Sequence, residues 1–231
     1  MPINYCPRIV TDNIALYLDA GNTKSYSGSG TTWTDISSKG NNGTLTNGPT
    51  FSSGNGGAIV FDGTNDYVSE TSGLSDSFLQ GNWSISFWAN FDTVNTGTGG
   101  ANDRPLLHHG SSATRKGLHL TNRSSKIKFG LYADDMNSSQ NLIADTWYNF
   151  VFTLNNTSYL KQIYINGLLD ISGTGGGAYT GTGSNARIGG KVLGFGKYFD
   201  GNMSIVAAYN RVLTALEVKQ NYNAIKGRFG L

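Results

Sequence analysis

The sequence is poor in charge, glutamate and cysteine. Charged residues occupy 14% of the 231 positions, against the usual ~25%, and only two of them are glutamates, Glu70 and Glu217. This composition argues against an intrinsically disordered chain or a coiled coil, because both are rich in charged residues. The single cysteine, Cys6, cannot form a disulfide within the chain, and we interpret it as an incidental thiol.

Long apolar runs and a strong charge of one sign are also missing. No run approaches the ~18 apolar residues of a spanning helix, so we expect no membrane insertion. The first residues lack a basic region followed by an apolar core, which predicts no secretory leader. The net charge of +2 is too small for a phosphate-neutralising surface, and nucleic acid is not expected as a partner.

Glycine, by contrast, is abundant. There are 32 glycines, roughly twice the average share of about 7%, and they are scattered among serine, threonine and asparagine. This mixture is typical of many short strands joined by tight turns. We therefore predict an all-β fold, a two-sheet antiparallel sandwich with one short C-terminal helix. The length fits a single domain over residues 1–231.

Local patterns locate the main elements. Residues 82–92 alternate core-facing apolar side chains with a half-polar face, which predicts a strand. Asn166 and Gly167 predict a type I′ hairpin between strands at 162–165 and 168–172. Thr214 and Glu217 have the spacing of a capping box, which predicts a helix through about residue 225. The apolar contacts of that helix are expected from Leu216, Tyr222 and Ile225.

Three glycine-rich segments are expected to lack regular structure. Residues 23–57 are interpreted as a long loop held by a few apolar side chains, including Trp33. Residues 93–102 and 173–184 are too polar to bury, so we expect exposed loops there.

Several short phrases of the sequence resemble the concanavalin A-like lectin/glucanase superfamily, in its laminin-G-like, or pentraxin-like, branch. They lie in the order of that family at 16–19, 33–44, 60–68, 84–88, 146–151, 163–167, 199–204 and 209–213. The resemblance covers nearly the whole chain and implies a jelly-roll sandwich.

The two ends of the chain carry a narrower resemblance. Residues 6–12 and 222–230 are similar to the ends of laminin-G-like proteins of tailed bacteriophages. This resemblance implies a virion structural protein, a capsid decoration or tail-fibre component, which assembles in the host cytoplasm and lies on the particle surface. Its implied partners are other virion proteins and copies of itself.

The same resemblance makes the terminal segments, 1–12 and 226–231, candidate anchors. Their docking side chains would be Ile3, Tyr5, Ile9 and Phe229. The alternative is that both ends pack against their own sandwich.

Paired carboxylates for glycoside hydrolysis are not found. Glucanases of the superfamily place acidic residues two or three positions apart on one strand, and a retaining pair needs carboxyls about 5–5.5 Å apart. Glu70 and Glu217 are distant in sequence, and Glu217 has a capping role. Asp134 and Asp135 are adjacent, so on a strand they would face opposite ways. We expect no enzyme and no catalytic residues, and glycoside hydrolase is the least favoured function.

The histidines do not form a metal-binding pattern either. His108 and His109 are adjacent and would face opposite sides of a strand. No cysteine or glutamate is spaced with them or with His119 for a zinc site. We interpret all three as surface or strand-end histidines.

Calcium enters through the family resemblance, because members of the superfamily often bind it with carboxylates and backbone carbonyls. The candidate ligands are Asp19, Asp62, Asp66 and Asp200. Ser204 stands where relatives often carry an acidic residue, which removes one ligand. Aspartate in an Asp-Gly turn ordinarily caps that turn, and this is the favoured interpretation. No cofactor is required, and a structural calcium stays open.

Carbohydrate binding has a physical basis in exposed aromatic rings, which stack on sugar faces while amides and hydroxyls bond the sugar hydroxyls. The ligand-binding candidates are Tyr179, Tyr198 and Trp88, although for Trp88 we favour a place in a second hydrophobic layer. The leading hypothesis is a non-enzymatic phage virion surface protein that binds cell-surface glycans weakly through many copies. The rival is a calcium-assisted lectin domain of bacterial origin.

Overall fold

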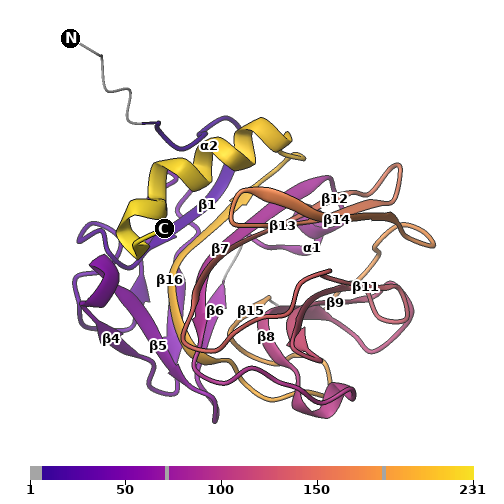
Figure 1. Cartoon of the computed structure of the whole chain (residues 1–231), viewed down its shortest axis with the longest axis horizontal. Helices are drawn as coiled ribbons and strands as arrows, with labels where there is room; N and C mark the ends of the chain where they lie inside the picture. The colour runs from indigo at the N-terminus through magenta and orange to yellow at the C-terminus, as the bar shows by residue number, and fades with distance from the viewer. Residues whose placement is uncertain (1–6, 71–72, 184–185) are drawn as a thin grey trace.

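The predicted sandwich is confirmed. The computed structural model describes residues 7–70, 73–183 and 186–231. Within these ranges two eight-stranded antiparallel sheets, sheet A and sheet B, pack face to face around one large core (Figure 1).

Sheet A has the order β14-β13-β12-β7-β16-β5-β4, and β1 also pairs with β16. Its strands are β1 (Ile14–Asp19), β4 (Thr50–Ser52), β5 (Ala58–Asp62), β7 (Trp83–Phe91), β12 (Trp147–Asn155), β13 (Leu160–Ile165), β14 (Leu168–Thr174) and β16 (Asp200–Tyr209).

Sheet B has the order β11-β10-β9-β8-β15-β6-β3-β2. Its strands are β2 (Thr32–Trp33), β3 (Gly43–Thr46), β6 (Tyr67–Glu70), β8 (Arg104–Gly110), β9 (Gly117–Arg123), β10 (Lys126–Gly130), β11 (Asp135–Asn137) and β15 (Arg187–Ile188). Short helical pieces, η1 (Gly54–Gly56), α1 (Asp76–Leu79) and η2 (Gly100–Asn102), lie in the connections.

Strand β7 lies near the centre of sheet A, between β12 and β16. Trp83, Ile85 and Phe87 point into the core, as their alternation predicts. The opposite face of β7 is partly polar, with Ser84, Ser86 and Asn90, yet every residue of the strand except Asn90 is buried. That face is covered as well, by the C-terminal part of the chain.

The cover of sheet A is α2 (Ala215–Ile225) followed by η3 (Lys226–Phe229), and Figure 1 shows α2 lying across β1 and β16. The capping box is confirmed, since Thr214 and Glu217 exchange both hydrogen bonds. Leu216 is 81% exposed, so its expected core contact is wrong. Val218 is the buried residue of α2 instead.

The other local predictions divide between confirmed and wrong. Asn166 and Gly167 have φ values of 51° and 78°, which confirms the type I′ hairpin between β13 and β14. Residues 23–57 do not form one long loop, because they contain β2, β3 and β4. Those strands find pairing partners elsewhere in the chain, which a local pattern does not reveal.

Among the described residues, no helix combines the length and apolarity needed to cross a membrane.

Candidate functional site

The outer face of sheet B carries a group of charged side chains. On β9, Leu118 and Leu120 belong to the core, so His119 between them points outward. On β10 the same alternation turns Lys128 outward. We call this group the sheet B cluster, and it consists of Asp103, His108, His119, Arg123, Lys128 and Asp135.

Two carboxylates, those of Asp103 and Asp135, pair with basic side chains of the sheet B cluster. Asp103 is fully buried and accepts two hydrogen bonds from Arg123, from Nε at 2.6 Å and from Nη2. Asp135 accepts from Lys128 Nζ at 3.1 Å. Arg123 Nη1 lies 3.9 Å from an oxygen of Asp135, so its contact with this second carboxylate is long.

His119 is held between two acceptors. Its Nδ1 lies 3.0 Å from the carbonyl oxygen of Gly117, and its Nε2 lies 3.2 Å from Oδ1 of Asp135. A carbonyl and a carboxylate can only accept, so each ring nitrogen of His119 faces an acceptor. Gly130 leaves room for the ring, because a Cβ there would lie 1.9 Å from His119 Nε2.

The titration of the cluster follows from these contacts. Burial opposes the ionisation of Asp135, but the hydrogen bonds and charges of His119 and Lys128 hold its pKa well below its usual range. The hydrogen bond to Asp103 raises the pKa of Arg123 against the effect of burial. Asp135 is therefore a permanent anion and Arg123 a permanent cation at physiological pH.

His108 differs from its neighbour His119. It is completely buried, and neither ring nitrogen has a hydrogen-bond partner among the described residues. Burial, followed by the charges of His119 and Arg123, lowers its pKa well below the ordinary value. A neutral imidazole thus lies directly behind the charged groups, with its ring 5.7 Å from that of Phe195.

An open hollow of about 360 Å³ lies against the sheet B cluster. Its lining residues are Gly100, His119, Arg123, Tyr132, Ala133, Asp135 and Phe195. The rings of Tyr132 and Phe195 are 6.1 Å apart. The segment that carries Phe195 is tied to the cluster by a hydrogen bond from Lys197 N to the carbonyl oxygen of Asp103. We call this space the sheet B hollow.

The turn that presents Tyr132 is strained. Tyr132 and Ala133 have φ values of 55° and 58°, and the turn is closed by a hydrogen bond of 3.1 Å from Leu131 N to Asp134 O. Such a turn ordinarily uses Asn-Gly, because each other L-residue in the left-handed region costs about 1–2 kcal/mol. Backbone strain of this kind concentrates at functional sites.

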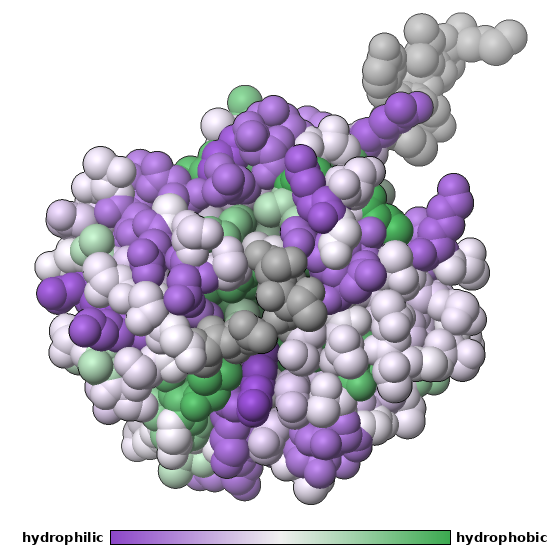
Figure 2. Space-filling view, turned by 180° about the vertical axis from the view of Figure 1, so that it is seen from behind, coloured by the Kyte–Doolittle hydropathy of each residue, from purple (hydrophilic) through white to green (hydrophobic). Residues whose placement is uncertain are grey.

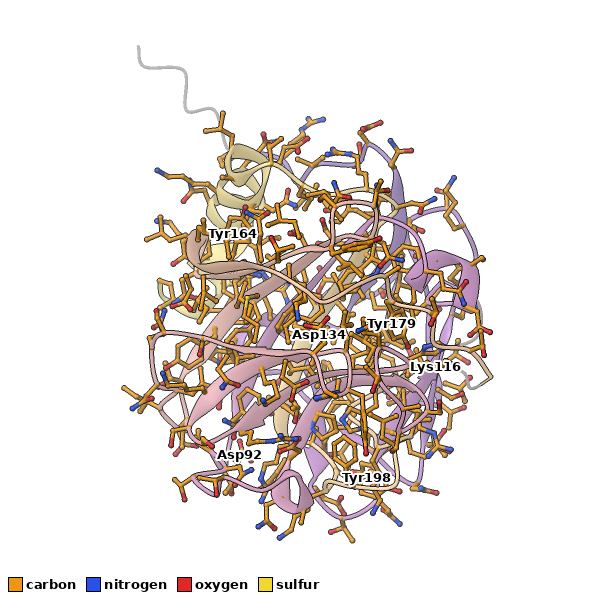
Figure 3. The ribbon with its side chains drawn as sticks, turned by 90° about the vertical axis from the view of Figure 1, so that its right-hand side faces the viewer. Asp92, Lys116, Asp134, Tyr164, Tyr179 and Tyr198 are labelled. Carbon is orange, nitrogen blue, oxygen red and sulfur yellow. The ribbon has the colours of Figure 1, made fainter. Side chains whose placement is uncertain are left out.

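Tyr179 does not lie at the surface, so the expectation of an exposed ring is wrong. Its side chain is 0% exposed, and its hydroxyl is 2.7 Å from His109 Nδ1. His109 in turn lies 2.8 Å from Asp76 through Nε2. Figure 3 shows Tyr179 within the molecule and Tyr198 near its lower edge, so the two tyrosines do not form one site.

The other two aromatic candidates are also engaged. Trp88 is 2% exposed and stacks on Phe229 at 4.3 Å and on Tyr222 at 5.7 Å. It belongs to the second hydrophobic layer, and no open face of its ring is left for a ligand. Tyr198 is half-buried, with Lys191 Nζ 5.5 Å from its ring centre.

Asp19, one of the calcium candidates, is occupied by a cation of the protein itself. Arg228 Nη1 donates to both of its carboxylate oxygens, at 2.8 and 3.0 Å. Arg228 Nη2 also donates to Ser204 Oγ at 2.9 Å. A guanidinium thus links Asp19 to the position where relatives often have an acidic residue.

The remaining three candidates lie where β5 and β16 pair and have partners of their own. Asp62 accepts from Thr64 N at 2.8 Å, which confirms its role as a turn cap. Asp66 accepts from Asp62 N at 3.2 Å, and Asp200 pairs with Arg104 at 3.3 Å. In the part of the chain that the structure describes, no group of three or more His, Cys, Asp or Glu side chains is placed to hold a metal ion.

The C-terminal segment packs against its own sandwich, which is the alternative to anchoring. Phe229 is buried beside Trp88, so its predicted docking role is wrong. Near the other end, Val10 N donates to Asn221 at 2.7 Å, which holds this stretch along α2, and Ile9 is half-buried. Ile3, Tyr5 and Cys6 lie outside the described residues.

A larger hollow of about 670 Å³ lies at another place, between residues 11–15, 37–41 and 73–78. Its lining is mostly hydroxyl and amide side chains. Phe78 is the one aromatic residue among its described lining residues, and it is buried. We therefore favour the sheet B hollow, where two aromatic rings and fixed charges meet.

Sequence reasoning missed the sheet B cluster, although one signal was present. His119, Thr121 and Arg123 are two residues apart, and this alternation continues with polar side chains on β10. It predicts a polar sheet face. Nothing local connects that face to Phe195, which comes from a connection more than 70 residues later.

A laminin-G family model, described as the concanavalin A-like lectin/glucanases superfamily, matches residues 62–219. No curated protein sequence matches the chain. Among solved structures, domain 4 of the arabinanase AbnA from Geobacillus stearothermophilus, in complex with arabinotriose, has a TM-score of 0.66 and 17% identity, covering 91% of this chain and 98% of that one.

Two further structures have the same fold with similarly low sequence identity. A Trypanosoma rangeli sialidase has a TM-score of 0.67 and 16% identity over 92% of this chain, which spans 33% of the sialidase. The binding domain of Paraclostridial mosquitocidal protein 1 has a TM-score of 0.63 and 14% identity, covering 93% of this chain and 52% of that one. These identities establish the fold alone. The chain belongs to the concanavalin A-like lectin/glucanases superfamily.

Proposed function

We propose that this protein is a non-enzymatic carbohydrate-binding domain whose ligand site is the sheet B hollow. The observation that carries the proposal is the lining of that hollow, in which two aromatic rings stand beside fixed donors and acceptors. Tyr132 and Phe195 offer apolar faces to the C–H groups of a sugar. Arg123 offers donors and Asp135 offers acceptors to its hydroxyls. The volume lies within the ~300–1,000 Å³ of ordinary ligand sites.

The electrostatics of the site favour binding over acid–base chemistry. A glycosidase needs one carboxyl that is protonated at working pH. Asp135 has a pKa well below its usual range, and both oxygens of Asp103 accept hydrogen bonds from Arg123. Asp135 therefore does not suit the role of general acid. Burial raises the pKa of Asp103, but this side chain is fully buried and both of its oxygens are engaged by Arg123. The arabinanase domain with arabinotriose is consistent with sugar binding by this fold.

We propose further that the domain is displayed on the surface of a tailed-phage virion, as a capsid decoration or tail-fibre component. This part rests on the resemblance of residues 6–12 and 222–230 to laminin-G-like phage proteins. Figure 2 shows a face dominated by polar and neutral residues, with hydrophobic ones in small separate areas, which suits an exposed surface protein. Many copies on one particle would convert weak glycan contacts into avidity.

The test of the binding site is calorimetric titration of glycans selected on an array. We expect Tyr132→Ala to weaken binding up to about tenfold, because a stacked aromatic contact contributes roughly 0.5–1.5 kcal/mol beyond the area that it buries. Tyr159→Ala is the matched control, since Tyr159 is exposed, has a positive φ of 62° and does not line the hollow. Equal binding by both variants would place the site elsewhere.

Three other outcomes decide the remaining parts of the proposal. Release of reducing sugar from a bound glycan would make the protein an enzyme. Loss of binding on adding a chelator would favour the calcium-assisted lectin instead. For the virion role, the measurement is the copy number in purified particles, and its absence from particles would overturn that role alone.

A further inference from the structure

We infer that the sheet B hollow continues behind the ring of Phe195 to His108, whose imidazole is the inner contact for a hydroxyl group of the glycan. The inference rests on the proposed function and deepens it, because it names a specificity-determining residue of the same site. It is carried by the burial of His108, by its lack of hydrogen-bond partners and by the ring that covers it.

His108 lies on the same face of sheet B as the hollow. In the register of β8 and β9 it is directly opposite His119, and opposite residues of antiparallel strands project from the same face. The two imidazole rings are 6.2 Å apart, and His119 lines the hollow. His109, the next residue on β8, turns the other way and meets Tyr179. His108 therefore stands beside the hollow, although it is fully buried.

The imidazole of His108 carries polar atoms that the protein does not use. Neither ring nitrogen has a hydrogen-bond partner among the described residues, although most buried polar side chains are bonded. Burial, followed by the charges of His119 and Arg123, lowers the pKa of His108, so its ring is neutral at physiological pH. A neutral imidazole has one N–H donor and one acceptor nitrogen. A hydroxyl group, which both donates and accepts, is the complementary group of a ligand.

Phe195 separates His108 from the hollow. Its ring centre lies 5.7 Å from that of His108, 5.6 Å from that of His119 and 6.1 Å from that of Tyr132, and Phe195 lines the hollow. A phenyl ring has no nitrogen or oxygen atom, so this packing leaves the imidazole of His108 unsatisfied, which is unfavourable. A sugar hydroxyl in the same place would satisfy it.

The loop around Phe195 leaves room for its ring to turn aside. Phe195 is half-buried, and the residues on both sides of it are glycines, so no adjacent side chain blocks the ring. A Cβ on Gly194 would meet no atom within 4 Å. The backbone beside the ring is fixed by a hydrogen bond of 2.8 Å from Lys197 N to Asp103 O. Rotation of the Phe195 side chain therefore uncovers His108 without a rearrangement of sheet B.

The first test uses stability and needs no ligand. His108→Leu should raise the urea midpoint of unfolding, because it removes two unsatisfied polar atoms from a buried position. His109→Leu is the matched control, since His109 is equally buried but its nitrogens lie 2.7 Å from Tyr179 and 2.8 Å from Asp76. This control should lower the midpoint. A lower midpoint in His108→Leu, or its failure to fold, would show that the imidazole stabilises the folded protein and would overturn the inference.

The second test measures binding to the intact chain by ligand-observed NMR titration. The probes are the methyl glycosides of galactose, glucose and mannose. We expect His108→Leu to weaken binding of the probe that the wild type prefers by about tenfold, because a hydroxyl of the bound sugar loses its partner. His108→Gln keeps a donor and an acceptor and should lose less. A residue with a structural role alone would not combine weaker binding with higher stability.

Access to His108 is tested with diethyl pyrocarbonate, which acylates an unprotonated imidazole that it can reach. His108 should react in the wild type, faster in Phe195→Ala, and more slowly when the preferred methyl glycoside is bound. His109 should stay unreactive throughout, because both of its nitrogens are engaged. Mass spectrometry of peptide fragments assigns the modified histidine. No reaction at His108 in either protein would overturn the inference.

The outcomes separate this inference from the proposed function. Equal binding by His108→Leu and the wild type, with weaker binding by Tyr132→Ala, overturns the inner contact while the glycan site stands. If neither these probes nor any glycan of the array binds to the hollow, the proposed function fails, and the inference fails with it.

Discussion

The outer faces of the two sheets have opposite characters. On sheet A the outward positions include Trp88 and Ile205, and the chain ends by covering them with α2 and η3. On sheet B the outward positions include His119, Arg123 and Lys128, and the first two line an open hollow. An apolar face must be buried, whereas a face of paired charges can stay accessible. The fold thus covers one outer face with its C-terminal segment and leaves a hollow open on the other.

The largest change in the free energy of unfolding is expected when the aromatic cover of sheet A is removed. Phe229→Ala should lower the free energy of unfolding by about 3 kcal/mol, because Phe229 is buried against Trp88 and Trp147. Leu216→Ala on α2 is the control and should change it by less than about 0.5 kcal/mol, since Leu216 is exposed. Urea denaturation measures both. Similar values for the two variants would show that the cover contributes no packing.

The next effect concerns the guanidinium that holds the cover to β1. Arg228→Ala should cost about 2 kcal/mol, because it leaves the largely buried carboxylate of Asp19 without its cation. Lys219→Ala, exposed on α2, should be near neutral. Since Arg228 occupies Asp19, added calcium should not raise the melting temperature of the wild type. A calcium-dependent rise, reversed by a chelator, would contradict this reading of the site.

On sheet B the backbone strain of the turn at Tyr132 and Ala133 can be tested by substitution. Ala133→Gly should raise the free energy of unfolding by about 1 kcal/mol, because glycine adopts the positive φ of this turn without cost. Ala113→Gly, exposed and without a positive φ, should instead lower it by a few tenths to about 1 kcal/mol. Thermal and urea denaturation measure both. If the two substitutions had the same sign, the Tyr132-Ala133 turn would not be strained.

The smallest effect depends on pH and again concerns the cover. The hydrogen bond from Arg211 lowers the pKa of Glu217 from the ordinary 4.5 to about 2. A depressed pKa means stabilisation that is present above about pH 4.5 and lost as the pH falls toward about 2. Glu217→Gln should therefore cost at most about 1 kcal/mol at neutral pH, after solvent screening, and nothing near pH 2.

Urea denaturation at both pH values measures this dependence. Asp145→Asn, at an exposed position, serves as the control and should show no comparable difference. A Glu217→Gln effect that is equal at both pH values would show that packing, rather than charge, links α2 to the sheet.

Two of the turns with positive φ at both central residues show how far sequence reasoning reaches. Asn166 and Gly167 were predictable because both residue types tolerate positive φ. Tyr132 and Ala133 adopt nearly the same conformation without that signal. The strands on either side, β10 and β11, pair in a register that requires the turn, and this pairing overrides local preference. The rim of the candidate site is therefore a place where local sequence rules fail.

Burial of aromatic residues shows the same limit. Tyr179 lies in a glycine-rich polar segment, and its surroundings in the sequence indicate exposure. Its ring is nevertheless buried against His109, because the two residues, 70 positions apart, meet across the core. The composition around a residue indicates that the segment is a loop. It does not indicate whether a side chain of that loop is buried in the folded protein.

By itself the sequence determined the all-β class, the alternation of β7, the Asn166-Gly167 hairpin and the capping box at Thr214, since each follows from neighbouring residues. The tertiary structure alone decided which sheet face is covered and which is open. Arg228 and Asp19 are 209 positions apart, and Phe195 reaches the sheet B hollow from a distant connection. Such contacts depend on strand order and register, which no local pattern of residues encodes.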